Sequence, residues 1–320
     1  MLKFFKFDKK DINYDFYTID FETANNYEFS PIQVAIVGIK NNKCTILLDT
    51  LINPGNDIFW DDMNYSIHGI SEKNIQSAPT VEKVFREISE ILDNNLVFAH
   101  NAVFDIKILR EGYSKFNIKK NFKYGCSLQI ARRTFKNLIN YRLDTLADNL
   151  NLKFNHHNAS DDASICANII LKSIEINNAS NINEMLDSIK YLIGNYDGET
   201  FTKAYSKRLY APGKITDKER AEVNIDETIE TEISGQRIVF TGTLSIPRSE
   251  AMILCGKNGA IPQPRITKDT NILVVGRNDY NNFKTGNKSN KMLKAEELIK
   301  KGQNLEIIDE TDFINLLEIR

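Results

Sequence analysis

The stretch that decides the fold reads Thr18-Ile19-Asp20-Phe21-Glu22-Thr23-Ala24, at the end of an apolar run that starts at Tyr14. Such a run predicts a buried central β-strand. Side chains two positions apart on a strand point to the same face, so we expect Asp20 and Glu22 to lie side by side. Two such carboxylates repel unless a cation lies between them or one takes a proton, and a hard divalent ion such as Mg²⁺ would bind there. A D-x-E pair alone is more often a solvated strand face, so further ligands must come from elsewhere in the chain.

The segments around this strand alternate between strands and helices. Strands are predicted over 31–39 and 44–49, joined by a tight turn at Asn41-Asn42, and over 96–100. Helices are predicted over 81–92, with Thr80 as the cap, and over 104–109. The other expectations are helices over 126–137, 143–150 and onward from a cap at Ser160 or Asp161, and a loop over 65–70. Three meandering strands followed by strands mixed with helices indicate an α/β mixed sheet.

The composition is that of a globular protein with more than one core. With 320 residues, of which 42% are hydrophobic and 26% charged, the chain is long enough for two domains. The formal net charge of −2 indicates no dominant class of partner. The cysteines form no C-x-x-C pair, which argues against a zinc site and a disulfide framework. This cysteine pattern favours a reducing cytoplasm. No apolar run reaches the ~18–20 residues of a membrane span, and lysines interrupt the N-terminus, so we expect no secretory signal and no membrane partner.

Charge distribution and hydrophobic pattern divide the chain into three parts. We expect a first domain over 1–178, a partly ordered acidic connector over 179–232 and a second domain over 233–320. The connector shows little periodicity apart from a short helix around 185–193. The second domain has the order β-α-β-β-α-β-α, which is typical of a small α/β module. Three of these strands are expected at 237–240, 271–275 and 305–308, and the helices at 248–258, 291–301 and 311–317.

Later acidic groups and a histidine complete the pair at Asp20 and Glu22. Asp105 follows an apolar strand, and Asp162 lies at the start of a helix, five residues after His157. Four carboxylates can hold two divalent ions, Mg²⁺ or Mn²⁺, which clamp a scissile phosphate in two-metal hydrolysis. His157 can take the proton from the attacking water, because an ordinary imidazole pKa of ~6.5 lies near working pH.

The order of these residues resembles the motifs of a known nuclease family. D-x-E-T is present as Asp20, Glu22 and Thr23, H-N-x-x-F-D as His100, Asn101, Phe104 and Asp105, and H-x-A-x-x-D-A as His157, Ala159, Asp162 and Ala163. An H-G-I segment, His68-Gly69-Ile70, precedes Ala78-Pro79-Thr80. Residues 1–178 thus resemble the DEDDh branch of the DEDD superfamily, the 3′→5′ exonucleases similar to the epsilon subunit of DNA polymerase III. The resemblance implies an RNase H-like fold.

The resemblance also implies a role for each matching residue. It makes Asp20, Glu22, Asp105 and Asp162 the metal ligands and His157 the general base. It implies contacts with the 3′-terminal nucleotide for Phe21, Thr23, His68, Ile70, Asn101 and Phe104. His156 is the competitor of His157 as the base, although register within the motif favours His157. Structural interpretations stay open elsewhere: a helix cap for Asp161, packing for His100 and Trp60, and core positions for Phe21 and Phe104.

The C-terminal segment resembles a second family. Residues 233–320 are similar to BRCT domains, particularly that of bacterial NAD-dependent DNA ligases, on Gly235, 239–244, Arg248, Gly259-Ala260, 270–276 and 291–295. The tryptophan of that family's last helix is absent, and Phe313 lies near its place. A turn formed by Thr241 and Gly242 can hold a phosphate, with Lys291, or alternatively Lys294, as a point charge. The competing interpretation is a solvated basic face on which Thr241 only stabilises a turn.

Together these features predict a metal-dependent enzyme that hydrolyses phosphodiesters at DNA 3′ ends. It would release nucleoside 5′-monophosphates in proofreading or repair, while the BRCT-like domain binds DNA or a polymerase or repair protein. One alternative is an exoribonuclease that trims RNA 3′ ends, which would need a pocket that admits the 2′-OH. Another is a binding adaptor in which the nuclease site is vestigial.

Overall fold

The chain forms two compact units. The computed structural model describes residues 13–25, 28–152, 158–206, 223–226, 228–229, 231–276 and 288–317. The first unit comprises Met1–Thr134 and Arg142–Lys207, and the second comprises Phe135–Tyr141 and Arg208–Arg320. The observed division therefore ends the first unit at Lys207, whereas the sequence predicts a boundary at 178.

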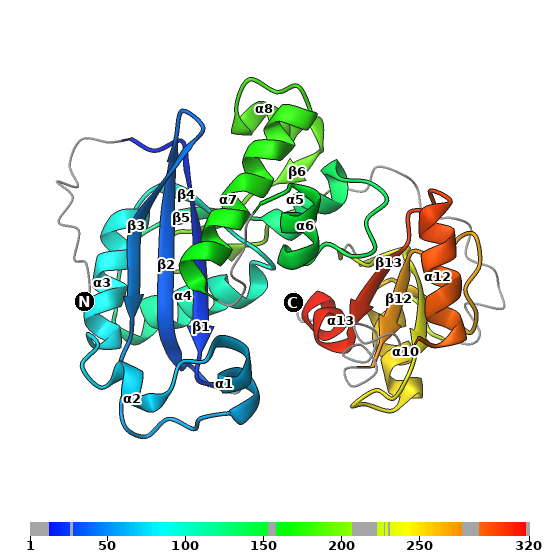
Figure 1. The fold of residues 1–320 in the computed structure, drawn as a ribbon, viewed down its shortest axis with the longest axis horizontal. Coiled ribbons are helices and arrows are strands. Elements are labelled where there is room, and N and C mark those ends of the chain that lie inside the picture. The colour runs from blue at the N-terminus through cyan, green and yellow to red at the C-terminus, as the bar shows by residue number, and fades with distance from the viewer. Residues whose placement is uncertain are drawn as a thin grey trace. The chain divides into compact units, whose positions relative to one another are not determined.

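The first unit contains a mixed seven-stranded sheet, as predicted (Figure 1). Its strand order is β3-β2-β1-β4-β5-β7-β8, so β1 is an interior strand between β2 and β4. An antiparallel meander comprises β1 (Phe16–Thr23), β2 (Pro31–Lys40) and β3 (Lys43–Leu51). Parallel to β1 follow β4 (Asn95–Ala99) and β5 (Phe122–Cys126), and two short antiparallel strands close the sheet, β7 (Gly194–Tyr196) and β8 (Phe201–Thr202). The β2–β3 turn has positive φ at both Asn41 and Asn42, which matches the predicted tight turn.

Helices pack on both faces of β1. On one face, Phe21 of β1 stacks on Phe85 of α3 (Val81–Leu92), with ring centroids 5.9 Å apart. On the other face, α7 (Ala159–Ile176) lies over β1 and β2 (Figure 1). The predicted cap of α3 is confirmed, since Thr80 Oγ1 accepts the Lys83 N–H. Further helices of the first unit are α2 (Glu72–Ile75), α4 (Val103–Lys115), α5 (Ser127–Thr134) and α6 (Leu143–Asn149).

Three segments differ from the sequence prediction. The expected loop at 65–70 contains the end of α1 (Asp62–His68), which Asp61 caps and which ends at Gly69 with φ +68°. Cys126, which we expected to begin a helix over 126–137, is instead the last residue of β5. The first part of the expected connector is folded, because its short strands pair with β5 and with one another. Hydrophobic periodicity does not reveal strands this short. This part of the chain contains α8 (Ile182–Ser188), β6 (Tyr191–Leu192), β7, β8 and β9 (Tyr205–Ser206).

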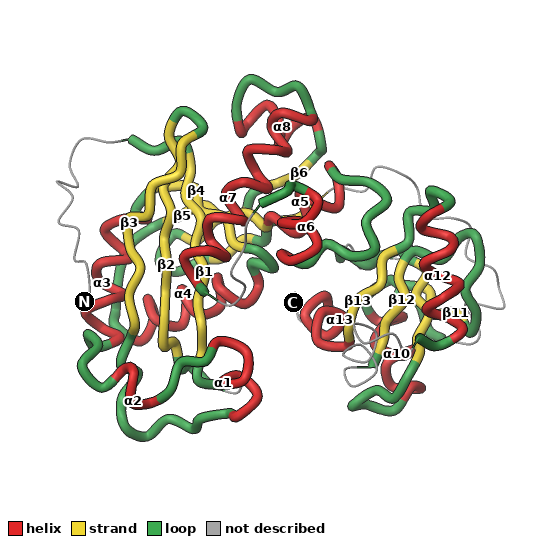
Figure 2. Tube along the Cα trace, in the orientation of Figure 1, coloured by secondary structure: helices red, strands yellow, loops and turns green. Residues whose placement is uncertain are grey.

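The second unit contains a parallel four-stranded sheet of order β11-β10-β12-β13 (Figure 2). Its strands are β10 (Arg237–Thr241), β11 (Ile261–Gln263), β12 (Ile272–Val275) and β13 (Glu306–Asp309). Its helices are α10 (Arg248–Lys257), α12 (Asn290–Lys300) and α13 (Glu310–Leu317). In the described residues the order is β-α-β-β-α-β-α, as predicted. Phe313 is buried against Phe240, with ring centroids 5.2 Å apart.

Two general expectations can be compared with the described residues. All four cysteines are free there, as their spacing predicted. Among the helices of the described ranges, none has both the length and the apolar character needed to cross a membrane.

A single glycine sets how closely α3 and α4 approach. A Cβ at Gly112 of α4 would overlap the ring of Phe85, which also packs against Phe21 and Phe116 and therefore has little room to move. We expect Gly112→Ala to lower the free energy of unfolding by about 1–3 kcal/mol, although alanine normally favours a helix. Urea denaturation would measure this, with Ser114→Ala on the exposed face of α4 as the control. Equal midpoints for the two variants would contradict the packing argument.

Candidate active site

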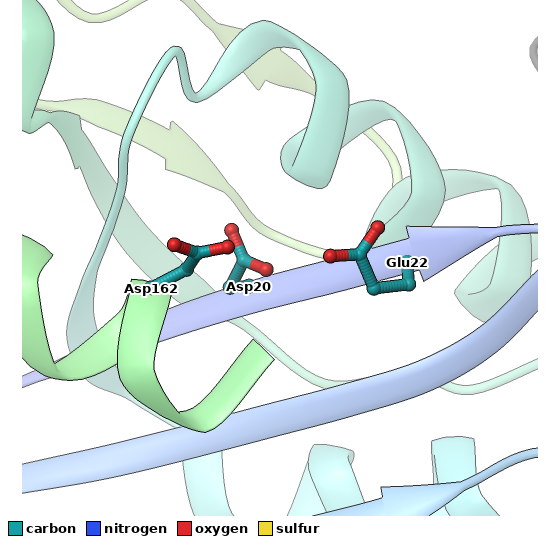
Figure 3. Close-up of side chains that lie close together, drawn as sticks. All are labelled: Asp20, Glu22 and Asp162. Atoms are coloured by element: carbon teal, nitrogen blue, oxygen red, sulfur yellow. The ribbon is translucent and has the colours of Figure 1, made fainter. Parts of the chain in front are cut away.

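Three carboxylates converge where β1 meets the first turn of α7. Asp20, Glu22 and Asp162 each offer an oxygen, and these atoms all lie within 4.8 Å of one another. Figure 3 shows Asp20 and Glu22 on the same side of β1, with Asp162 approaching from α7. Strand alternation therefore brings the first two together, as the sequence predicts, and the fold adds a group from 140 positions further along the chain.

The start of α7 determines where Asp162 lies. Asn158 is the N-cap, and its side-chain oxygen accepts the N–H groups of Ser160 and Asp161 at 3.1 and 3.3 Å. The predicted cap at Ser160 or Asp161 is therefore wrong by two or three positions. Asp162 follows one turn later and is only 4% exposed. The positive end of the helix dipole favours an anionic side chain at this position.

Asp105 completes the predicted set from a different element. It lies in the first turn of α4 and is 2% exposed. Its Oδ1 accepts the backbone N–H of Phe21 at 3.0 Å, so it is tied to β1 between Asp20 and Glu22. Asp105 is not one of the three groups whose oxygens lie within 4.8 Å of one another. The structure thus joins Asp105 to the same strand, at a position beside the three-carboxylate cluster.

Burial and mutual repulsion make these acids hard to ionise together. Burial raises the pKa of Asp20 well above its usual range, and the carboxylates of Asp105, Asp162 and Glu22 raise it further. Burial also raises the pKa of Glu22 to about 8, with a contribution from Asp162. Burial raises the pKa of Asp105 as well, although the hydrogen bond from Phe21 opposes this change. Each shift indicates negative charge that the protein alone does not compensate.

The donor set fits a hard divalent cation. The converging groups are all carboxylates, the ligand type that Mg²⁺ and Mn²⁺ prefer. A bound cation would remove the repulsion that raises the pKa of Asp20 and Glu22. The residues present therefore fit the metal ions that the motifs imply.

A group of hydrogen bonds surrounds Thr23, immediately after the carboxylate pair. The register of β1 with β2 shifts between Glu22 and Thr23, which ends the regular strand. The Thr23 carbonyl oxygen contacts Asn64 Nδ2 at 3.1 Å and His68 Nε2 at 3.2 Å, and Asn64 Nδ2 also lies 3.3 Å from Thr23 Oγ1. His68 Nδ1 accepts the Ile70 N–H, so its Nε2 carries the proton donated to Thr23. Burial lowers the pKa of His68, consistent with this neutral tautomer.

The remaining predicted residues of the first unit lie in several environments. The Phe21 ring is buried against Phe85 on the face opposite Asp20, so the structure gives the ring a core position while its N–H binds Asp105. Ile70 and Trp60 pack against one apolar cluster, which confirms packing for Trp60. His100 Nδ1 lies 2.9 Å from Ser127 Oγ, as expected for a structural histidine. Asn101 has φ +59° in the turn before α4, and Phe104 is half-buried. His156 and His157 lie outside the described residues.

In the second unit, polar groups gather at the carboxyl end of β10. Thr241 Oγ1 lies 3.2 Å from Ser289 Oγ, and Gly242 has φ +76°. Lys291 Nζ donates to the Phe240 carbonyl at 2.8 Å, and Arg248 donates to the carbonyls of Phe240 and Gly242 at 3.0 and 2.8 Å. Burial lowers the pKa of Lys291, and the charge of Arg248 adds to this.

Lys294, the alternative lysine, has a different partner. Its Nζ donates to the Ile266 carbonyl at 2.9 Å, in the loop after β11. Between the two candidates, Lys291 is therefore the one that the structure brings to the Thr241 turn.

Comparison with known proteins identifies the first unit. Residues 17–170 match the model of the family described as Exonuclease (RNase_T). DNA polymerase III subunit epsilon of Aquifex aeolicus is 32% identical over 165 residues, which cover 50% of this chain and 80% of that protein. The chain belongs to this exonuclease family. The family is one of metal-dependent nucleases, and the enzyme class predicted from the motifs is confirmed.

Longer relatives match about half of this chain. DNA polymerase III PolC-type of Caldanaerobacter subterraneus subsp. tengcongensis is 30% identical over 181 residues, or 54% of this chain. The match spans only 13% of that polymerase's length. Among solved structures, a complex of exonuclease X with 5′-overhanging duplex DNA is 24% identical and has a TM-score of 0.44, covering 54% of this chain and 98% of the other.

Asn64, which contacts Thr23, is the site residue that sequence reasoning missed. It lies four positions before His68 on α1, so the two side chains share one face of the helix. Recognition of Asp61 as an N-cap and Gly69 as the C-terminal stop would have predicted α1 and therefore this pairing.

The raised pKa of Glu22 predicts a pH-dependent stability in the absence of metal. Its pKa is about 8 in the folded protein against 4.5 as the reference value, so the folded state binds the proton more tightly. Its contribution to stability is complete below pH 4.5 and is lost as the pH rises through about 8. With a chelator present, we expect the free energy of unfolding to fall over this window by about 1–2 kcal/mol from Glu22, a value discounted for partial exposure.

Urea titrations at several pH values would check this expectation. Glu22→Gln should flatten the decline, and Glu72→Gln, at an exposed position on α2, should not. An identical pH dependence in the wild type and Glu22→Gln would show that Glu22 does not carry the effect.

Proposed function

We propose that the chain is a Mg²⁺- or Mn²⁺-dependent 3′→5′ exonuclease that acts on DNA and releases nucleoside 5′-monophosphates. The observation that supports this most directly is the cluster of Asp20, Glu22 and Asp162, with Asp105 hydrogen-bonded to the same strand. Membership of the exonuclease family supports the reaction class. The choice of DNA rests on the relative named as a DNA polymerase III subunit and on the resemblance of the second unit to BRCT domains.

Each predicted residue would have a separate task in this reaction. Asp20, Glu22, Asp105 and Asp162 would hold the divalent ions, which supply charge stabilisation and a nucleophilic water when bound. His157 would accept the proton of that water. Thr23, held by Asn64 and His68, would contact the terminal nucleotide beside the scissile bond. Ile70, Asn101 and Phe104 would also contact the 3′-terminal nucleotide.

The second unit would act as a BRCT domain that binds a DNA phosphate. The Lys291 ammonium has three N–H groups, of which one donates to Phe240. Thr241, the Gly242 backbone and Lys291 would bind the phosphate oxygens, and Arg248 would hold the turn through its two carbonyl contacts. This binding would bring DNA, or a polymerase or repair protein on DNA, to the nuclease.

Two neighbouring aspartates give a matched test of the nuclease site. We expect Asp162→Asn to reduce the rate on a 3′-labelled single-stranded DNA by more than about 100-fold, because a ligand loss should exceed the loss seen for outer-shell partners of a metal. Asp161→Asn should retain most of the activity, because Asp161 lies on the same turn but outside the cluster. Full activity in Asp162→Asn would refute the proposed metal-dependent mechanism.

The same assay would test the substrate class. Single-stranded DNA, mismatched duplex DNA and RNA of the same sequence should be digested side by side with Mg²⁺. A preference for RNA would support the exoribonuclease alternative, and absence of Mn²⁺ binding by calorimetry would support the adaptor alternative.

The phosphate site predicts a charge-dependent loss of DNA binding. Lys291→Gln should weaken binding of a duplex with a 5′-terminal phosphate by about tenfold, since a charge-assisted hydrogen bond is lost. Lys300→Gln, in the last turn of the same helix, is the control and should have little effect. Fluorescence anisotropy with the full chain in EDTA would measure both affinities. A phosphorylated duplex that binds Lys291→Gln as tightly as wild type would refute the site.

A further inference from the structure

A buried hydroxyl connects the strand and the helix that carry the carboxylates. Thr18 lies in the middle of the sheet on β1, between Val37 of β2 and Phe98 of β4, and is 0% exposed. Its Oγ1 donates to the Ala163 carbonyl at 2.7 Å, across 145 residues of sequence. Ala163 directly follows Asp162, so the hydrogen bond reaches α7 beside one of the candidate ligands.

The position of Thr18 on β1 places it on the same face as the candidate ligands. Thr18, Asp20 and Glu22 alternate along the strand and therefore point the same way. The side chain that precedes Asp20 on this face is thus hydrogen-bonded to α7. Any shift of α7 along or away from β1 at this point would also move Asp162 relative to Asp20.

We propose that Thr18 is a positioning residue that sets the spacing between the β1 and α7 sides of the metal site. The inference rests on the proposed function, because it assumes that Asp20, Glu22 and Asp162 bind a divalent ion. Thr18 itself contacts neither the metal nor the substrate. It acts through the backbone of the residue after Asp162.

The packing of α7 explains why a directional bond is needed here. The fully buried residues of α7 include Ala159, Ala163 and Ala167, which are four positions apart and therefore share the helix face that Thr18 contacts at Ala163. Apolar contacts between small groups are non-directional and leave the position of the helix along the strand weakly determined. A hydrogen bond has a defined length and angle, and the β-branched side chain of Thr18 restricts where its oxygen can lie.

A second chain of contacts anchors the next turn of α7. Cys166, four residues after Asp162, donates through Sγ to Ser127 Oγ at 3.3 Å, and Ser127 in turn contacts His100 Nδ1 at 2.9 Å. These contacts join α7 to α5 and to the residue after β4. Thr18 adds a direct hydrogen bond between β1 and α7, which opposes the mutual repulsion of the carboxylates before a cation binds.

The decisive measurement is the Mn²⁺ affinity of the folded full chain by isothermal titration calorimetry. Thr18→Val keeps the shape of the side chain and removes the hydroxyl. We expect it to raise the Mn²⁺ dissociation constant about tenfold, at the low end of the range for outer-shell partners of a metal. Thr18→Ser keeps the hydroxyl and should bind Mn²⁺ within about twofold of wild type.

A threonine outside the site provides the control. Thr50 on the edge strand β3 is also buried, and its hydroxyl donates to the Leu51 carbonyl at 3.0 Å. Thr50→Val should leave the Mn²⁺ affinity unchanged, whatever it does to the melting temperature. If Thr18→Val does not fold, the pair Thr18→Ser and Thr18→Ala makes the same comparison of hydroxyl against none.

The outcomes separate this inference from the proposed function. Wild type that binds Mn²⁺, together with a Thr18→Val affinity equal to that of wild type, would overturn the positioning role even if the variant melts earlier. Wild type that does not bind Mn²⁺ would overturn the proposed function and the inference with it. A loss of affinity in Thr18→Val that Thr18→Ser restores would support the role.

Discussion

The repulsion between carboxylates at the end of β1 is the constraint on which the first unit depends. Asp20, Glu22 and Asp162 have oxygens within 4.8 Å of one another, and Asp105 is tied to the backbone between the first two. Burial raises the pKa of Asp20, Glu22 and Asp105, so the folded protein holds acids that are difficult to ionise together. Hydrophobic packing elsewhere must compensate for this local cost, which a divalent cation would relieve.

The two faces of β1 divide these tasks between them. Side chains at even positions face α7 and form the site, whereas Ile19 and Phe21 face the core beneath α3. A one-residue shift of register would exchange the two sets, so the same pairing with β2 and β4 that builds the sheet also orients the carboxylates. The register shift at Thr23 ends this alternation and presents its carbonyl to Asn64 and His68.

The second unit concentrates positive charge by a different device. Arg248 and Lys291 both donate to the Phe240 carbonyl, which holds two cationic side chains beside one turn. Like charges at this distance disfavour each other, and the pKa of Lys291 is lowered as a result of burial and of Arg248. An anion at the turn would reverse that penalty, as a cation would in the first unit. The proposed nuclease and phosphate sites thus depend on the same principle with opposite sign.

The sequence by itself determined the elements with strong local signals. Alternation placed Asp20 and Glu22 on one face, Asn41-Asn42 marked the hairpin, and Thr80 marked the start of α3. The joint order of the motifs indicated the exonuclease family, because few arrangements bring those residue types together by chance. Local signals also separated the second unit, whose strands and helices follow the predicted order.

Only the tertiary structure decided how distant segments meet. The hydrogen bond from Thr18 to Ala163 spans 145 residues. No local sequence pattern distinguishes a buried threonine whose hydroxyl is hydrogen-bonded to a distant residue from one that only packs, as a valine would. The Phe21 ring lies in the core because Phe85 occupies that face, which depends on the packing of α3. Short strands such as β7 and β8 carry too few residues for a periodic signal and are ordered by pairing with β5 and with each other. Sequence therefore specified the chemical groups and their local direction, whereas long-range packing set the distances between them.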